Sequence, residues 1–260
     1  MTQKERASFP AKLSNTRPVA GRPGVVRAQA GSSIPAASKP QGLGMDSLAV
    51  RARMVQLLQK QGIADAQVLQ AMGAIERHRF VDSALVNQAY EDTSLPIGLG
   101  QTISKPGVVS RMIELLRNGS AGKLGRVLEI GTGCGYQAAV LSMLASEVYS
   151  IERLRGLHDK ARENLRHFRL ANVHLLFGDG MEGYAKGAPY AGIIAAAGGE
   201  AVPQAWLDQL AVGGRLVAPV HSKSIAGGGQ ALLVVDKTPT GYQQSLLEAV
   251  HFVPLKSGVA

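Results

Sequence analysis

The sequence predicts a doubly wound α/β fold, with a mostly parallel sheet between helices, N-terminal helices before it and an antiparallel C-terminal edge. Strand-like apolar segments alternate with helical segments between residues 127 and 220, as in parallel βαβ units. A short buried strand at 127–130 runs directly into a glycine-rich turn and a helix at 138–145. Two more apolar segments, 231–235 and 246–253, follow with short turns and favour an antiparallel edge. These observations indicate a Rossmann-like sheet.

The same patterns give the remaining elements. Further strands are expected at 147–152, 173–177, 193–197 and 215–220, with helices at 155–170 and 203–210, the second ended by Gly213 and Gly214. Before the sheet, helical periodicity predicts helices at 48–61, 66–75 and 108–116, and Asp65 is a good N-cap for the second of them.

Proline and glycine punctuate residues 95–106, so this segment is expected to be a loop. Thr102 and Ser104 lie just before the helix at 108–116, and the residues alone favour helix capping for both. The segment 77–82 contains His78 between two arginines, which favours an exposed helix end over a contact with a polyanion.

The glycine turn reads Gly131-Thr132-Gly133-Cys134-Gly135. Glycine permits positive φ and lets another group approach the backbone closely. A strand, a glycine turn and a helix form a nucleotide cradle, in which backbone N–H groups at the helix start face the ligand. A tight turn without a ligand is the alternative.

Acidic residues lie within, at the end of, or just after three predicted strands. Glu129 lies inside an apolar strand, where a buried carboxylate needs a cationic or hydrogen-bonding partner. Glu152 ends the next strand, where an acid accepts both ribose hydroxyls of a nucleotide-like ligand, although a surface ion pair is the alternative. Gly178-Asp179-Gly180 follows a third strand and indicates either the ligand crevice or turn chemistry.

Composition limits the classes of function. The net charge is +9, but residues 1–44 carry seven of the 28 Lys and Arg and one of the 19 acids, so the body is nearly balanced. A nearly balanced body argues against nucleic-acid binding. Cys134 is the only cysteine, which excludes an intrachain disulfide and fits the cytoplasm, and the six histidines show no metal-ligand spacing. No apolar run reaches the length of a membrane span.

Residues 1–44 are rich in Pro, Gly, Ser, Ala and Arg, so they are expected to form a disordered basic tail. A transit peptide is a weaker reading, and Met45 is an alternative functional start. Residues 45–260 are expected to form one domain, with helices and a loop at 45–120 and the Rossmann-like core at 121–260.

Between about Val55 and Leu255 the chain resembles the protein-L-isoaspartate O-methyltransferases, a family within the class I methyltransferases that use S-adenosyl-L-methionine (AdoMet). The specific part of the resemblance is the Thr-Ile-Ser-x-Pro segment at 102–106. The other matching segments are 80–82, 95–98, 127–137, 151–153, 178–180, 213–220 and 252–255. The chain departs from the family pattern at Cys134, Ala191 and Ala196.

The resemblance implies transfer of a methyl group from AdoMet to the free α-carboxyl of L-isoaspartyl residues in damaged proteins, which starts repair through a succinimide. It reverses the capping interpretation and makes Ser104 and Thr102, in a substrate loop, the catalytic residues. The residues implied to hold AdoMet, without a metal, are Glu129, Gly131, Thr132, Gly133, Gly135, Glu152, Gly178, Asp179 and Gly180. The expected partners are isoaspartyl-containing proteins and peptides, bound by a cytoplasmic monomer that binds neither nucleic acid nor membrane.

Two alternatives stay open at this stage. A class I methyltransferase acting on RNA or a small metabolite would share the glycine motif without needing the Thr-Ile-Ser-x-Pro segment. A non-catalytic AdoMet sensor would bind the cofactor without methylating an isoaspartyl peptide, and the alanines at 191 and 196 are its only support.

Overall fold

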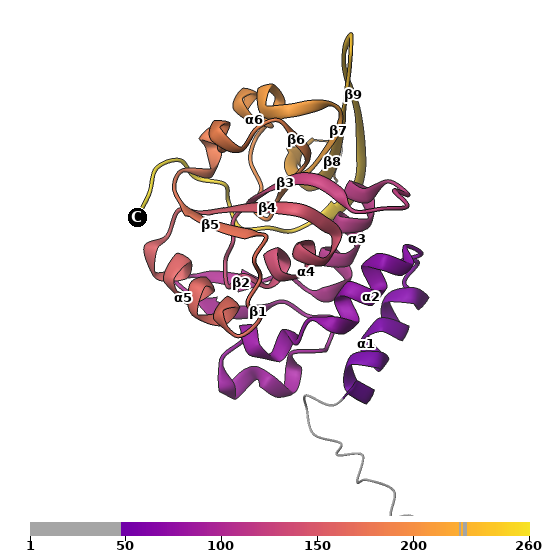
Figure 1. The fold of residues 1–260 in the computed structure, drawn as a ribbon, viewed down its shortest axis with the longest axis vertical. Coiled ribbons are helices and arrows are strands. Elements are labelled where there is room, and N and C mark those ends of the chain that lie inside the picture. Colours follow the sequence, from indigo (N-terminus) through magenta and orange to yellow (C-terminus); the bar gives the residue numbers. More distant parts are fainter. Residues whose placement is uncertain (1–47, 224, 226–227) are drawn as a thin grey trace, which may run out of the picture. The chain divides into compact units, whose positions relative to one another are not determined.

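The computed structural model describes residues 48–223, 225 and 228–260 (Figure 1). The tail predicted at 1–44 lies outside these residues. The elements are α1 (Leu48–Lys60), α2 (Ala66–Ala74), η1 (Arg77–Phe80), η2 (Ser83–Gln88), β1 (Leu95–Gly98), β2 (Gln101–Ile103), α3 (Pro106–Arg117), β3 (Leu124–Ile130), α4 (Tyr136–Leu144), β4 (Ala145–Glu152), α5 (Arg155–Arg166), β5 (Val173–Phe177), η3 (Gly180–Glu182), η4 (Ala185–Gly187), β6 (Tyr190–Ala195), α6 (Gln204–Gln209), β7 (Leu210–Ser222), β8 (Gly229–Thr238) and β9 (Gly241–Val250).

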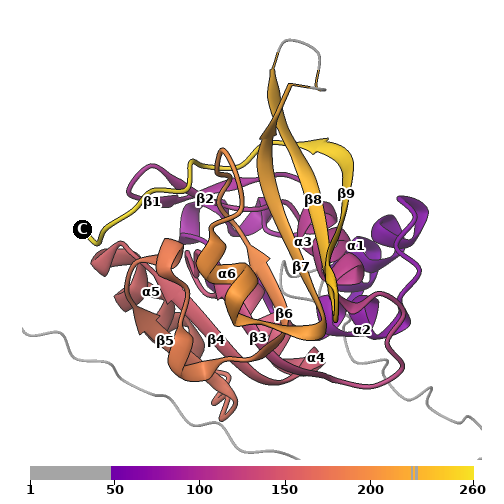
Figure 2. The same cartoon turned by 90° about the horizontal axis from the view of Figure 1, so that it is seen from above.

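The larger sheet confirms the predicted fold class. Its strand order is β5-β4-β3-β6-β7-β8-β9. The strands from β5 to β7 are parallel, and β8 and β9 continue the sheet with antiparallel pairing, as expected for the C-terminal edge (Figure 2). The order reverses between β3 and β6, and ligands of doubly wound sheets bind outside the carboxyl ends of the strands at such a reversal.

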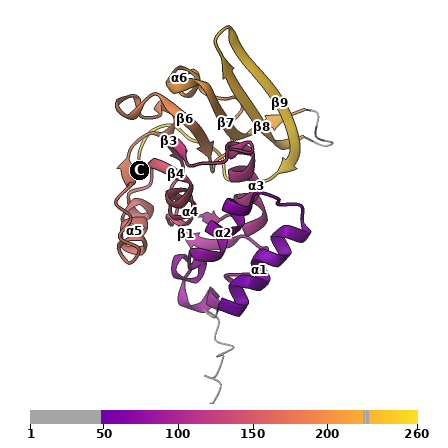
Figure 3. The same cartoon turned by 45° about the vertical axis from the view of Figure 1, so that its right-hand side comes forward.

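Alternate side chains of the central strands face two separate cores. Val127 and Val148 belong to the core shared with α1 to α5, and α2 packs on both α3 and α4 (Figure 3). Leu128 and Ile193 face the other side, where Trp206 of the short helix α6 is buried among them. None of the described helices combines the length and hydrophobicity needed to span a lipid bilayer.

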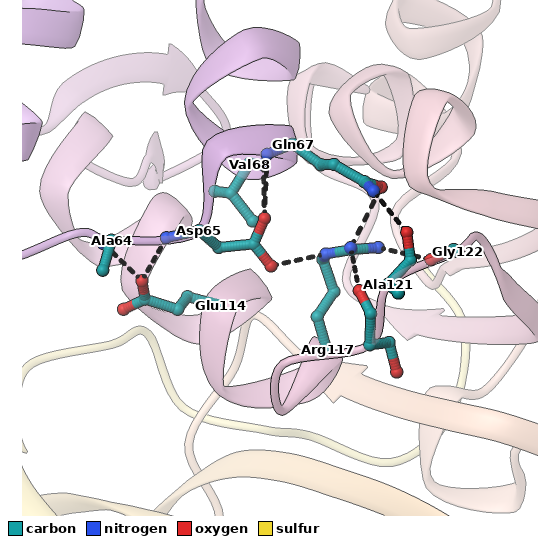
Figure 4. A network of polar contacts seen from close by, with 9 residues as sticks. Ala64, Asp65, Gln67, Val68, Glu114, Arg117, Ala121 and Gly122 are labelled. Carbon is teal, nitrogen blue, oxygen red and sulfur yellow. Dashed lines mark hydrogen bonds and ion pairs between the residues drawn. The ribbon is translucent and has the colours of Figure 1, made fainter.

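A polar network around the buried Arg117 joins the start of α2 to α3 (Figure 4). Asp65 caps α2 as predicted, since its Oδ1 accepts hydrogen bonds from the N–H groups of Gln67 and Val68. Its Oδ2 accepts a hydrogen bond of 2.7 Å from Nε of Arg117, whose side chain is fully buried at the end of α3. Glu114 accepts hydrogen bonds from the N–H groups of Ala64 and Asp65.

The expectation of a loop at 95–106 is wrong, because β1 and β2 form an antiparallel hairpin there. Leu95, Ile97 and Ile103 are buried, and along β1 buried and exposed residues alternate. The buried side chains pack the short strands against the core despite the proline and glycines. Neither Thr102 nor Ser104 caps α3, since the N-cap is Lys105, which makes no side-chain cap bond.

Three smaller predictions also need correction. Helix α5 ends at Arg166, not at residue 170, and β9 ends at Val250. Helix α6 ends at Gln209, and Gly213 and Gly214 lie within β7, where a Cβ on Gly214 would come within 2.9 Å of the carbonyl oxygen of Tyr190.

Arg77 is fully buried instead of lying at an exposed helix end. Its Nε donates a hydrogen bond of 2.7 Å to the carbonyl of Ala89, and its guanidinium lies 4.7 Å from the ring centroid of Tyr136. The aromatic face offsets part of the cost of burying the charge.

Candidate active site

A cavity of about 490 Å³ opens at the carboxyl ends of β3 and β4, next to the strand-order reversal. Its size suits a nucleotide-sized ligand. The residues that line it are Ile97, Leu99–Ser104, Val109, Ile130–Cys134, Tyr136, Gln137, Ile151–Leu154, Leu157, Gly180, Ala196, Ala197 and Val253–Lys256. The set includes seven predicted site residues, namely Thr102, Ser104, Gly131, Thr132, Gly133, Glu152 and Gly180.

The glycine turn forms part of the lining of this cavity. Gly131 has φ +89° and Gly133 has φ +57°, a conformation that favours glycine. The N–H groups of Gly131 and Thr132 donate to the carbonyl of Ile151, and that of Gly133 donates to Glu152. These three N–H groups are therefore bonded within the protein, whereas the expectation concerned the N–H groups at the start of the helix that follows, α4.

Glu152 lies at the end of β4 with its carboxylate held in place. Its Oε2 accepts a hydrogen bond of 2.8 Å from the N–H of Gly133, and its Oε1 accepts one of 2.9 Å from the N–H of Leu154. Each oxygen keeps acceptor capacity, because a carboxylate oxygen can accept more than one hydrogen bond. A fixed carboxylate that lines the cavity suits a ligand with neighbouring hydroxyl groups.

Glu129 lies behind the cavity wall and is fully buried. One carboxylate oxygen accepts a hydrogen bond from Ser150, whose hydroxyl lies 2.6 Å from that of Thr132. The other carboxylate oxygen of Glu129, Oε1, has no hydrogen-bond partner among the described residues. Burial, together with the nearby charge of Glu152, raises the pKa of Glu129 to about 8. The carboxyl is therefore mostly protonated at neutral pH.

Gln137 is a cavity residue that the sequence analysis did not single out. It lies in the first turn of α4 and is 8% exposed. Its amide helps to lower the pKa of Glu129, yet within the described residues its Nε2 makes no hydrogen bond of normal geometry. A buried polar group that faces a cavity without a partner is available to a ligand. Its only sequence signal is its place directly after the glycine turn.

Besides Glu129, three predicted cofactor residues lie outside the described set that lines the cavity. Gly135 is the N-cap of α4, where a Cβ would come within 3.1 Å of Leu165 in α5. Gly178 follows β5 and donates its N–H to the carbonyl of Glu152. Gly135 therefore allows the close packing of α4 against α5, and Gly178 joins the end of β5 to the end of β4.

Asp179 is the third of these residues. Its Oδ1 accepts a hydrogen bond from the N–H of Met181, and its Oδ2 accepts one from the N–H of Gly258. Asp179 therefore caps η3 and fixes the C-terminal segment, residues 251–260. Figure 2 shows this segment running from β9 across the strand ends, where Leu255 donates its N–H to the carbonyl of Gly198.

A second cavity of about 640 Å³ lies between the start of α3 and the end of β9. Thr102, Ser104, Ala196 and Val253 line both cavities, so they mark the place where the two meet. Hydroxyl groups at this junction can contact a ligand in either cavity. The described residues contain no group of three or more His, Cys, Asp or Glu that could hold a metal ion.

The chain matches a known protein family. The family model described as protein-L-isoaspartate(D-aspartate) O-methyltransferase matches residues 49–260. The chain belongs to this family.

Relatives of the family cover nearly the whole chain. The protein-L-isoaspartate O-methyltransferase of Methylibium petroleiphilum is 56% identical, over 98% of this chain and 98% of its own. That of Leptothrix cholodnii is 54% identical, over 98% of this chain and 95% of its own.

Solved structures of the family share the fold. A protein-L-isoaspartate O-methyltransferase structure, 28% identical, matches 80% of this chain and 66% of its own with a TM-score of 0.71. A putative member from Plasmodium falciparum, solved in complex with S-adenosyl-L-homocysteine, is 23% identical with a TM-score of 0.66 and matches 79% of this chain and 98% of its own. At that identity the second match supports the fold alone.

Proposed function

We propose that this chain transfers a methyl group from AdoMet to the free α-carboxyl of L-isoaspartyl residues in damaged proteins, which starts their repair through a succinimide. Family membership supports the reaction. The observation that carries the proposal in this structure is the junction of two cavities at Thr102 and Ser104. One cavity would hold the cofactor and the other would admit the substrate peptide.

The 490 Å³ cavity fits AdoMet in its size and in its polar groups. Glu152 would accept hydrogen bonds from the two ribose hydroxyls, since its carboxylate is already oriented by Gly133 and Leu154. The amide of Gln137, which lines the cavity beside Glu129, offers a donor to the cofactor or the substrate. When bound, AdoMet supplies an electrophilic methyl group on a positively charged sulfur.

The protein needs no general base for this reaction, because the acceptor carboxylate is already ionised at neutral pH. Its task is to hold the carboxylate oxygen in line with the methyl group and sulfur, and such alignment lowers the barrier by several kcal/mol. We assign this task to Ser104 and Thr102, whose hydroxyls would donate hydrogen bonds to the carboxylate. A new oxygen–methyl bond replaces the sulfur–methyl bond, and the sulfur keeps the electron pair.

The supporting residues have distinct roles in this proposal. Gly131, Thr132, Gly133 and Gly180 would contact the cofactor, since all of them line the cavity. Glu129, Gly135, Gly178 and Asp179 would act from behind the wall, by fixing the turn, the helix packing and the C-terminal segment.

We also propose that the enzyme acts as a cytoplasmic monomer on isoaspartyl-containing proteins and peptides, without nucleic-acid or membrane partners. The only cysteine is buried, and burial raises its pKa to about 11, so the thiol is unreactive. A sequence without disulfides fits a reducing compartment.

The decisive experiment measures transfer of labelled methyl from AdoMet to two peptides that differ only in L-isoaspartate against L-aspartate. The proposal predicts a base-labile methyl ester on the isoaspartyl peptide and background on the other. Label on neither peptide, with AdoMet binding shown by calorimetry, would instead indicate another acceptor or a sensor.

A further inference from the structure

Leu99 lies in an unfavourable conformation at the tip of the β1–β2 hairpin. Gly98 pairs with Gln101, so Leu99 and Gly100 form a two-residue turn, with φ of +52° and +68°. Positive φ at both positions is the type I′ pattern, which prefers Asn, Asp or Gly at the first. A leucine side chain cannot make the local hydrogen bonds that favour Asn or Asp in such a turn. Its left-handed backbone conformation therefore raises the free energy of the folded protein.

The side chain of Leu99 is also 63% exposed, so it adds little to the hydrophobic core. The neighbouring hairpin residues Ile97 and Ile103 are 1% and 4% exposed. A strained backbone and an exposed apolar side chain at one residue point to a role outside folding.

The hairpin contacts α5 at Ile97 and at the tip residue Leu99. Lys160 donates hydrogen bonds of 2.9 Å to the carbonyl of Ile97 and to the carboxylate of Asp82. A Cβ on Gly156 would come within 3.1 Å of the Leu99 side chain, so glycine at 156 leaves room for leucine against the first turn of α5.

Leu99 lines the 490 Å³ cavity together with Glu152, the last residue of β4, and with Arg153 and Leu154, which connect β4 to α5. If Glu152 holds the ribose, Leu99 lies on the side of the cavity that receives the adenosyl group. Purine and ribose carbon atoms form an apolar surface that a leucine side chain can shield from water.

We propose that Leu99 is a positioning residue that closes the cofactor cavity over the adenosyl group and slows its release. This inference rests on the proposed function, because it takes AdoMet as the ligand of the cavity. Contacts with the bound cofactor would then offset the unfavourable backbone conformation of Leu99. In the free protein nothing offsets it.

The test compares Leu99→Asn and Leu99→Met with wild type in the full chain. Asparagine suits the turn, so we expect the free Leu99→Asn protein to melt at the same temperature as wild type or higher. Binding of S-adenosyl-L-homocysteine, measured by calorimetry, should weaken by about 5- to 10-fold with faster dissociation. Leu99→Met keeps an apolar cover and should bind within about twofold of wild type.

Leu246→Asn is the matched control, because Leu246 is 44% exposed on β9 and lies outside the described lining of both cavities. It should leave affinity unchanged. Wild-type affinity in Leu99→Asn, or a lower melting temperature with unchanged affinity, would overturn the closing role while leaving the proposed function intact. Failure of the wild-type protein to bind S-adenosyl-L-homocysteine would overturn both.

Discussion

Ser104 lies where the two cavities meet. It lines both cavities and is partly exposed at the end of the β1–β2 hairpin. A hydroxyl in this position can orient a carboxylate that enters from one cavity toward a methyl group held in the other. We therefore propose that Ser104 acts in the reaction step and not in holding the cofactor.

Replacing Ser104 by Ala should lower kcat by about 10- to 100-fold, the loss of one hydrogen bond to a charged group. Affinity for S-adenosyl-L-homocysteine should stay within about twofold, since other residues of the cavity would hold it. Steady-state kinetics and calorimetry measure the two quantities. Ser83→Ala, at an exposed serine of η2, is the control. A wild-type kcat in Ser104→Ala would remove the role assigned here.

Glu129 makes stability depend on pH. An unfolded chain loses this proton near pH 4.5, whereas the folded protein keeps it to about pH 8. Between these values the folded state binds more protons, so stability from this group is full below pH 4.5 and is lost as pH rises through 8.

Glu129→Gln should therefore change the pH profile of unfolding in the free protein. The wild-type free energy of unfolding should fall relative to the variant by up to about 1.4 kcal/mol per pH unit across this window. Urea unfolding at several pH values measures the difference. A wild-type-minus-variant difference that does not change with pH would show that Glu129 is ionised in the folded state.

The sequence predicted cavity residues that belong to recognisable motifs. It did not predict contacts or cavity residues that depend on the tertiary structure. Glu152 could be predicted as a cavity residue because it ends a strand at a typical distance after the glycine turn, and it does line the cavity. Asp179 was assigned to the ligand, but its second oxygen bonds Gly258, which is remote in sequence. Gln137 was missed because an amide in a helix is ordinary until a cavity lies beside it.

At the scale of elements, the Asp65–Arg117 network joins the start of α2 to the end of α3 (Figure 4). Burial by itself would raise the pKa of Asp65, but the hydrogen bond from Arg117 and those from the α2 backbone lower it below its usual value. Arg117 also donates to the carbonyls of Ser120 and Gly122 and to the amide oxygen of Gln67.

Arg117→Met should destabilise the protein by about 2–3 kcal/mol, because it leaves the partly buried Asp65 without its cation and breaks the hydrogen bonds of a buried guanidinium. Chemical denaturation measures the loss. Arg166→Met is the control, since Arg166 is 80% exposed and pairs only with Glu163 among the described residues, so its removal should cost less than about 0.5 kcal/mol. Equal effects of the two substitutions would contradict the importance of the network.

Elements with strong periodicity were predicted well, and short ones were not. The strand at Val173–Phe177 has the bounds that its apolar residues predict. The β1–β2 hairpin was missed because its strands are short and contain proline and glycine. Their pairing is stabilised by burial of Ile97 and Ile103 against the domain, which local sequence signals do not show.

At the scale of the whole molecule, the sheet, the N-terminal helices and the C-terminal segment all contribute walls to the two cavities. The residues that line them run from Gln61 to Lys256. The fold class was predictable because alternating strands and helices admit few topologies. The meeting of the cavities at Ala196 and Val253 was not, because it depends on how remote segments cross.

Deleting residues 1–44, so that the chain starts at Met45, should leave kcat/KM for an isoaspartyl peptide within about twofold. Both cavities are lined by residues beyond this segment. Steady-state kinetics of the full-length and shortened proteins at equal concentration tests the expectation. A large loss of activity in a shortened protein with an unchanged melting temperature would give the segment a role in substrate capture.

The central claim is that cofactor and substrate occupy two cavities that meet at Ser104 and Thr102. The most direct measurement is a structure of the protein with S-adenosyl-L-homocysteine and an isoaspartyl peptide bound together. The account predicts the first ligand in the cavity with Glu152 and the Gly131 turn, and the isoaspartyl carboxylate at the Ser104 hydroxyl. A peptide bound away from this junction, or a cofactor product outside the 490 Å³ cavity, would contradict it.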